Sequence, residues 1–192
     1  MTAMRPRHYP GLPRSTPTAW RRFHFGTTLL MALCLALVGC GGGEQVRRGA
    51  TPLPMGRDWP QVVPADPGAA NAVLMRAIGL VGTPYRYGGN TPEGGFACSG
   101  LVTYVYRDML DLRLPRTSRD LAKVQGPRIA PERLAAADLV FFGSGGNVTH
   151  VGIYIGEGRF VHAPSSGGTV RLDRLDGTYW RQNYSGSKRV LN

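Results

Sequence analysis

Three side chains in this sequence have the chemistry of a nucleophilic active site: Cys98, His150 and His162. Cys98 follows a glycine-rich stretch and begins a segment whose apolar residues recur at helical spacing, namely Leu101, Val102, Val105, Met109 and Leu112. A cysteine in the first turn of a helix lies at the positive end of the helix dipole, which lowers the pKa of the thiol and favours the thiolate. The two histidines lie on later, strand-like segments and are candidates to exchange a proton with it. This set predicts a cysteine hydrolase.

The other two cysteines lie near the N-terminus, where the pattern is that of a sorting signal. Two arginines at 21–22 precede the apolar run 29–38, which has the length of a signal-peptide core and is too short to span a bilayer. Residues 37–40 (LVGC) resemble the lipobox of bacterial lipoproteins, in which the cysteine is lipidated and becomes the first mature residue. We therefore predict a signal peptide over residues 1–39 and a lipid on Cys40. A chance cysteine at the end of an ordinary signal peptide is the alternative.

These predictions place the protein in the bacterial cell envelope, attached to the membrane through lipid on Cys40. Gly41 follows that cysteine in place of an aspartate, which in enteric-type bacteria favours the outer membrane, here facing the periplasm. Once the signal peptide is removed, Cys98 is the only free thiol and has no internal disulfide partner. A buried, inert thiol is the alternative to a reactive one. The small residues around Cys98 favour a reactive thiol, because they leave room for a substrate backbone.

The charge distribution is compatible with a cell-wall ligand. The net charge of +11 includes five arginines and no acid in residues 1–39, and the remainder has 18 basic and 12 acidic residues, a net charge of +6. A moderately basic domain suits an anionic polymer or lipid. No basic run, zinc pattern or aromatic RNA-binding pattern occurs, so no nucleic-acid partner is expected. No metal or other cofactor is expected, since the two histidines lack a carboxylate at metal-ligand spacing. Protein partners stay open.

The remaining pattern predicts one α+β domain, with helices first and an antiparallel sheet second, over residues 68–192. Residues 40–67 are rich in glycine, proline and charge and are expected to form a flexible tether, in which Trp59 either docks on the domain or stays free. Helices are expected over residues 66–81, 98–109 and 117–124. Strands are expected over residues 139–142, 151–155, 160–163, 170–175 and 184–191.

The hairpin that carries the two histidines poses a geometric problem. A regular hairpin that turns at Glu157 and Gly158 puts His162 opposite Ile153, three residues from His150. This separation is about 10 Å along the strand, and the two side chains point to opposite faces. A bulge, a wider loop or a strong twist has to bring them together.

Six segments, in order along the chain, resemble the NlpC-type cell-wall cysteine peptidases. They are residues 84–89 (PYRYGG), 98–102 (CSGLV), 114–118 (LPRTS), 137–142 (ADLVFF), 150–156 (HVGIYIG) and 160–163 (FVHA). The resemblance covers roughly residues 69–191. It implies a papain-like fold, with N-terminal helices packed on an antiparallel sheet. It also implies cleavage of peptidoglycan stem peptides, often at bonds that involve diaminopimelate or D-amino acids, or of the D-alanyl-diaminopimelate cross-link.

The resemblance also implies roles for individual residues. Cys98 is the nucleophile, His150 holds its proton and later delivers it to the leaving amine, and His162 orients His150. Tyr85 places its hydroxyl near the developing oxyanion, beside the Cys98 backbone N–H. Ser99 and Arg116 are assigned to the substrate rim or to bracing of the loops.

One position departs from the family pattern: Ala97 replaces the aspartate that usually precedes the nucleophile. Without the aspartate carboxylate, the chain lacks a possible contact with the substrate, above all with a free amino group of the stem peptide. Two alternatives to a peptidoglycan endopeptidase follow. One is a catalytically silent envelope protein that binds cell wall, and the other is a thiol amidase or acyltransferase that uses the same three residues.

Overall fold

The computed structural model describes Leu53, residues 59–166 and residues 168–191. The predicted signal peptide (1–39), the predicted lipid site Cys40 and most of the predicted tether up to residue 58 lie outside the described residues and stay predictions. The described residues belong to one compact unit, Arg47–Asn192. Among them, no helix has both the length and the apolar character that a membrane span requires.

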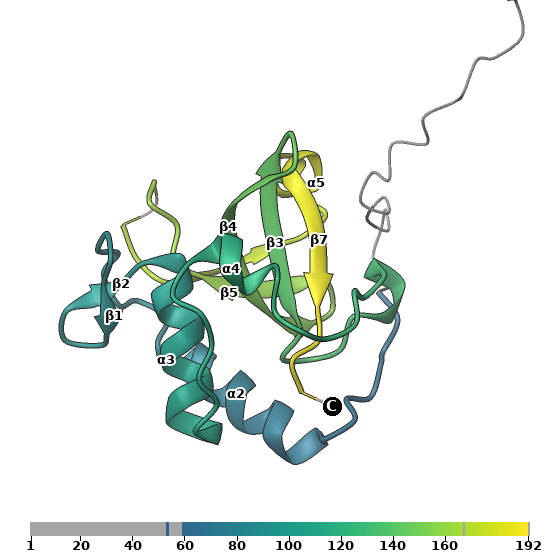
Figure 1. Cartoon of the computed structure of the whole chain (residues 1–192), viewed down its shortest axis with the longest axis horizontal. Helices are drawn as coiled ribbons and strands as arrows, with labels where there is room; N and C mark the ends of the chain where they lie inside the picture. The colour runs from purple at the N-terminus through teal and green to yellow at the C-terminus, as the bar shows by residue number, and fades with distance from the viewer. Residues whose placement is uncertain (1–52, 54–58, 167, 192) are drawn as a thin grey trace, which may run out of the picture. The chain divides into compact units, whose positions relative to one another are not determined.

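The chain has the predicted order of helices followed by an antiparallel sheet (Figure 1). The helices are α2 (Pro67–Gly79), α3 (Cys98–Leu110), α4 (Ser118–Leu121), the 3-10 helix η1 (Pro131–Arg133) and α5 (Thr178–Asn183). The main sheet contains, in spatial order, β6 (Arg171–Arg174), β5 (Arg159–His162), β4 (Asn147–Gly156), β3 (Leu139–Ser144) and β7 (Tyr184–Lys188). A separate two-stranded sheet pairs β1 (Asn90–Thr91) with β2 (Gly95–Phe96). The predicted α+β fold class is confirmed.

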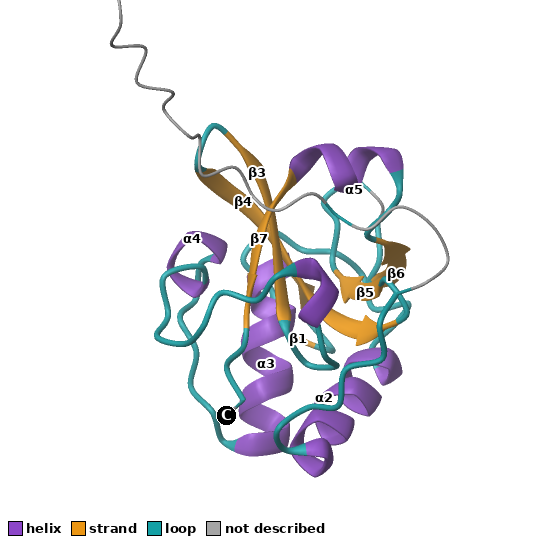
Figure 2. Ribbon diagram, turned by 90° about the vertical axis from the view of Figure 1, so that its right-hand side faces the viewer, coloured by secondary structure: helices purple, strands orange, loops and turns teal. Residues whose placement is uncertain are grey.

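The core has two parts, one on each face of the sheet. Helices α2 and α3 pack against each other and cover one face, as Figure 2 shows from the side. Leu139 and Phe141 of β3 belong to this part of the core, whereas Val140 and Phe142 belong to the part on the opposite face. Because successive side chains of a strand point to opposite faces, a strand buried on both sides needs an uninterrupted apolar run.

Local signals explain where the helices begin. At α2, the Asp66 carboxylate accepts a hydrogen bond from the Ala69 N–H at 2.9 Å. At α4, the Thr117 hydroxyl accepts one from the Asp120 N–H at 3.1 Å, but the helix ends at Leu121 and is shorter than predicted. The small β1–β2 sheet and α5 were not predicted, because segments of two to six residues are too short to show a periodic pattern.

Trp59 is docked on the domain. It is 6% exposed, packs in the second part of the core and lies 6.2 Å from the Tyr154 ring, centroid to centroid. Gly158 makes room for it, since a Cβ at that position would lie 2.2 Å from the Trp59 indole nitrogen. Of the two possibilities for Trp59, the structure has the docked one, and burial of this aromatic ring holds residues near 59 against the domain.

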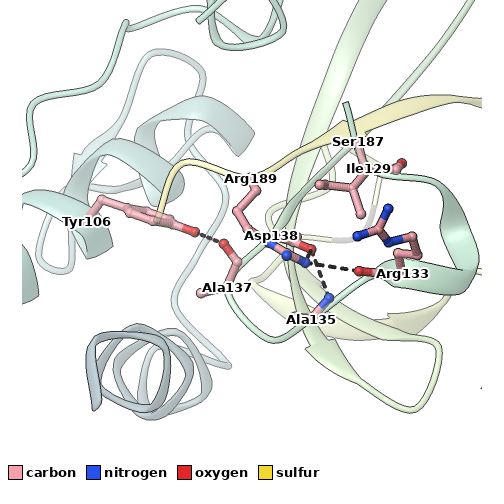
Figure 3. A network of polar contacts seen from close by, with 8 residues as sticks. All are labelled: Tyr106, Ile129, Arg133, Ala135, Ala137, Asp138, Ser187 and Arg189. Carbon is pink, nitrogen blue, oxygen red and sulfur yellow. Dashed lines mark hydrogen bonds and ion pairs between the residues drawn. The ribbon is translucent and has the colours of Figure 1, made fainter. Parts of the chain in front are cut away.

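A buried ion pair joins the start of β3 to the end of the chain (Figure 3). The Asp138 carboxylate is 1% exposed and accepts two hydrogen bonds from the Arg189 guanidinium, both at 2.8 Å. It also accepts the Ala135 N–H at 2.8 Å, and Arg189 donates to the Arg133 carbonyl at 3.0 Å. Every group in this cluster is charged or hydrogen-bonded to a charge, which is the condition for a stable buried carboxylate.

Candidate active site

Cys98 is the first residue of α3, as predicted. The glycine-rich loop approaches the first turn so closely that a Cβ on Gly100 would lie 1.9 Å from the Gly89 carbonyl oxygen. Further along the helix, the Tyr106 hydroxyl donates a hydrogen bond to the Ala137 carbonyl (Figure 3). The helix is thus held against the loop at one end and against the start of β3 at the other, which fixes the position of the cysteine.

The thiol of Cys98 lies against β4. Burial raises the pKa of the thiol above its ordinary value, and hydrogen bonds from the backbone N–H groups of Val151, Ser99 and Cys98 lower it by less. The predicted lowering of this pKa is therefore wrong, because loss of solvation of the thiolate outweighs the N–H groups at the helix start. Since Val151 follows His150, its contact with the sulfur puts the cysteine beside the strand position that carries the first histidine.

His150 and His162 lie on neighbouring strands and their rings are in contact, with His150 Nε2 2.9 Å from His162 Nδ1. The β4–β5 register shifts near the turn, so that Ile153 pairs with Val161. Continuing this register puts His162 opposite Gly152, two residues from His150 and on the same face. A β-bulge, rather than a wider loop or a strong twist, therefore brings the two histidines together.

Two residues that the sequence analysis missed complete this cluster: Asp173 of β6 and Trp180 of α5. Asp173 Oδ2 lies 3.1 Å from His162 Nε2 and accepts a hydrogen bond from the Trp180 indole N–H at 2.8 Å. The His162 nitrogen is buried and has no well-directed hydrogen bond in the described part of the chain, so this carboxylate is an ion-pair partner at short range rather than an ideal acceptor. The Trp180 ring stacks on His150 at 5.4 Å and meets His162 edge-on at 4.7 Å.

Asp173 is an anion in this setting. Burial works against its ionisation, but hydrogen bonds from Arg171 and Trp180 outweigh burial and hold the pKa of the carboxyl below its usual range. The Arg171 Nη2 atom lies 3.0 Å from Asp173 Oδ2. The only sequence signal for this residue was a carboxylate in a strand predicted next to the one with His162. Without the register, that signal did not distinguish it from a solvent-exposed acid.

Both imidazoles are neutral at pH 7. Burial lowers the pKa of His150 to about 4, although the Asp173 charge raises this pKa by a smaller amount. Burial and the nearby His150 lower the pKa of His162 as well. The neighbouring Asp173 anion favours a proton on His162 Nε2, which leaves His162 Nδ1 to accept from His150 Nε2–H. In this tautomer His150 Nδ1 is unprotonated and can act as a base.

A cleft of about 370 Å³ opens beside His150. It is lined by Thr149, His150, Pro164, Ser165, Ser166, Arg171, Tyr179 and Trp180. The Tyr179 side chain is 65% exposed and its ring lies 4.9 Å from the Trp180 ring. The cleft therefore offers a bound peptide an aromatic wall and the His150 side chain.

The other predicted site residues divide into two groups. Tyr85 and Ser99 lie at the cysteine: burial and the Cys98 sulfur raise the pKa of the Tyr85 hydroxyl, and Ser99 contributes its N–H to the thiol. Arg116 lies elsewhere, in a hollow along α3 whose lining includes neither Cys98 nor a histidine.

The fold and this site define a papain-like α+β domain with a cysteine at a helix start and a histidine pair on adjacent strands. The chain belongs to the NlpC/P60 family, whose sequence pattern matches residues 82–189. It is similar to murein DD-endopeptidase MepH of Escherichia coli K12, with 37% identity over 126 residues, which are 64% of this chain and 46% of MepH. The chain thus spans about half the length of this relative.

Two solved structures resemble the domain. An NlpC/P60 family protein from Bacillus cereus has a TM-score of 0.61 and 29% identity, over 71% of this chain and 43% of that protein. RipD of Mycobacterium tuberculosis, described as a non-catalytic NlpC/p60 domain protein adapted to peptidoglycan binding, has a TM-score of 0.54 and 27% identity, over 64% of this chain and 98% of RipD. The family therefore includes both a named endopeptidase and a binding protein.

Proposed function

We propose that this protein is a peptidoglycan endopeptidase that hydrolyses stem-peptide or cross-link amide bonds by a thiol mechanism. The observation that carries the proposal is the 2.9 Å contact between His150 and His162, beside the strand position that contacts the Cys98 sulfur. Membership of the NlpC/P60 family and the similarity to a murein endopeptidase support peptidoglycan as the substrate. No metal or organic cofactor enters the mechanism.

The neutral state of the pair determines the first step. As the substrate carbonyl is attacked, the Cys98 S–H proton passes to His150 Nδ1 and the sulfur forms a bond to the carbonyl carbon. His150 becomes an imidazolium, which His162 and the Asp173 anion stabilise through the Nε2 side of the ring. Asp173 and Trp180 are positioning residues in this scheme, since they act through the histidines.

The remaining steps return the enzyme to its starting state. The Tyr85 hydroxyl and the Cys98 backbone N–H are the donors proposed for the oxyanion of the tetrahedral intermediate. His150 gives its proton to the leaving amine as the C–N bond breaks, which leaves a thioester on Cys98. Water, deprotonated by His150, then attacks the thioester, and the sulfur leaves as the thiol after recovering that proton.

One of the two alternatives has specific support. Ala97 in place of the usual aspartate and the raised pKa of the Cys98 thiol favour a domain that binds cell wall without cleaving it, as RipD is described. A thiol amidase or acyltransferase would use the same three residues and would differ only in its products.

The test is digestion of purified peptidoglycan by the full-length chain, with mass spectrometry of the released fragments. We expect wild type to release peptides by hydrolysis of one type of amide bond, and Cys98→Ala to release none. Cys34→Ser is the matched cysteine control and should cleave like wild type. If the wild-type chain binds sacculi but cleaves neither sacculi nor soluble muropeptides, the endopeptidase proposal fails and the binding function replaces it.

We also propose that lipid on Cys40 anchors the protein in the cell envelope, at the outer membrane on its periplasmic side. The support is the sequence pattern of residues 29–41, which lie outside the described residues. Cells that express the full-length chain can be labelled with radioactive palmitate. Label on wild type and on Cys34→Ser, but not on Cys40→Ser, would support the anchor, whereas an unlabelled wild-type chain would contradict it.

A further inference from the structure

A second hollow, separate from the cleft beside His150, lies along α3. Its volume is about 330 Å³. Its lining includes Arg107, Arg113, Arg116, Asn90, Thr103 and Tyr104. Three arginines thus converge on one depression, one from the last turns of α3 and two from the segment that follows it. The mechanism proposed above uses none of them.

Among the described residues, these three guanidinium groups have no counterion. Within the described part of the chain, none of them forms an ion pair or a side-chain hydrogen bond. Their neighbour Arg76 contrasts with them, since it pairs with Asp108 at 2.7 Å and donates to the Tyr104 hydroxyl at 2.6 Å. Asp108, the residue after Arg107, is therefore already paired with Arg76. Tyr104 accepts from Arg76, so its own O–H proton stays available as a donor.

Backbone geometry brings the positive charges together. Helix α3 ends at Leu110, and the next residue, Asp111, has a left-handed conformation (φ 50). The chain turns there, so that Arg113 and Arg116 line the same hollow as Arg107. Leu114, between them, packs against the core and holds this segment in place. Like charges gathered without a counterion raise the free energy of the folded chain and attract an anion. Guanidinium groups match the geometry of carboxylate and phosphate oxygens.

The position of the hollow relates it to the cysteine. Ser99, Thr103 and Arg107 are spaced four residues apart and so share one face of α3. At 1.5 Å per residue, Thr103 lies roughly 7 Å and Arg107 roughly 13 Å beyond Cys98 along the helix axis. An extended peptide advances about 3.3 Å per residue. A substrate that follows α3 from the sulfur would thus reach the hollow at Thr103 about two residues from the scissile bond and Arg107 about four residues from it.

We propose that this hollow binds a free carboxylate of the peptide substrate, two to four residues away from the bond that is cleaved. The proposal rests on the proposed function, because it takes a peptide as the ligand. It assigns Arg107 and Arg113 to substrate binding and gives Arg116, predicted at the substrate rim or in bracing of the loops, a role in this separate site. A phosphate group is the other anion with suitable chemistry.

Binding measured without turnover tests the hollow independently of cleavage. Titration calorimetry would use the full-length Cys98→Ala chain and soluble stem peptides, either with free carboxylates or with every carboxylate amidated. We expect amidation to weaken binding about tenfold or more, the size of one charge-assisted hydrogen bond. In the same background, Arg107→Gln together with Arg113→Gln should remove most of that difference. The two substituted side chains are exposed and unpaired in the described structure, so the fold should be unaffected.

Arg133→Gln is the matched control, because it removes one positive charge from an exposed position in η1 outside the hollow. It should retain the full effect of amidation. Equal binding of the two peptides by the Cys98→Ala parent would overturn the proposal, as would an undiminished effect in the double variant. Competition by inorganic phosphate, with no effect of amidation, would also overturn it and identify a phosphate site. Charge-dependent binding together with a wild-type chain that cleaves neither peptide would support the hollow while the endopeptidase function fails.

Discussion

Two aspartates, Asp138 and Asp173, each accept hydrogen bonds from an arginine, but they occupy different kinds of network. Asp138 is almost fully buried, and its partners are Arg189 and a backbone N–H, which do not titrate near neutral pH. Asp173 is partly exposed, and His162 is among its partners. Asp138 links two distant segments of the domain, whereas Asp173 places a negative charge beside the His162 imidazole, which can gain or lose a proton.

The role of a carboxylate in such a network thus depends on whether its partners can change their protonation state. A network of permanent charges and backbone groups has one arrangement, so it contributes stability and little else. A network that includes histidine links the carboxylate to protonation of the imidazole and therefore to acid–base chemistry.

The largest expected effect is on stability. Asp138→Ala should lower the free energy of unfolding by about 3–5 kcal/mol, because it leaves the Arg189 charge without its partner. Urea denaturation followed by circular dichroism measures this change. Asp176→Ala, which breaks the more exposed pair with Arg174, should cost about 1 kcal/mol or less. Equal decreases in the free energy of unfolding for the two variants would show that the buried Asp138 pair stabilises the domain no more than the more exposed Asp176 pair.

Asp173→Asn should affect catalysis more than stability. The change preserves the shape of the side chain but removes the anion that favours the reactive tautomer of the histidine pair. On the peptidoglycan assay, we expect kcat to fall about 10- to 100-fold with KM nearly constant, since a positioning role acts on the transition state. Urea denaturation should show a loss of about 1 kcal/mol or less. A large loss of stability with unchanged kcat would make Asp173 a structural residue like Asp138.

The neutral cysteine–histidine pair has a consequence for the pH dependence of alkylation. Because burial raises the pKa of Cys98 and lowers that of His150 to about 4, the thiolate forms only as the pH rises above the ordinary thiol value of about 8.5. The rate of reaction with iodoacetamide should follow that rise, measured by mass spectrometry in a Cys34→Ser and Cys40→Ser background. The same chain unfolded in urea is the control and should reach half its maximal rate at lower pH. A folded chain that reacts at its full rate near pH 7 would contain a preformed ion pair, contrary to this prediction.

The smallest expected effect concerns the tryptophan that joins the histidines to the aspartate. Trp180→Phe keeps an aromatic ring beside His150 but removes the hydrogen bond to Asp173. We expect a decrease in kcat of a few fold and a loss of about 1 kcal/mol of stability. Trp59→Phe is the matched control, because the Trp59 indole N–H has no hydrogen-bond partner among the described residues. If both substitutions leave kcat unchanged, the hydrogen bond to Asp173 does not position the histidines.

Much of the fold followed from local patterns in the sequence. The Asp66 cap, the apolar spacing after Cys98 and the uninterrupted run of β3 each reflect an interaction within a few residues, so the pattern carries the information. The same holds for the order of helices and strands. Short segments such as α5 gave no signal, because their structure depends on what they pack against. Trp180 shows this, since its ring lies 4.6 Å from Phe142 of a different element.

The candidate site divides along the same line. The helix that begins at Cys98, the neighbouring strands of the two histidines and the resemblance to a known peptidase family could all be predicted from the sequence. The bulge that puts both histidines on one face, the contacts of Asp173 and Trp180 with them, and the separation of Arg116 from the cysteine required the tertiary structure. The tertiary structure also reversed the predicted shift of the Cys98 pKa. The physical reason is that register, burial and solvation depend on which distant segments meet, whereas helix starts and strand patterns depend on neighbours in the chain.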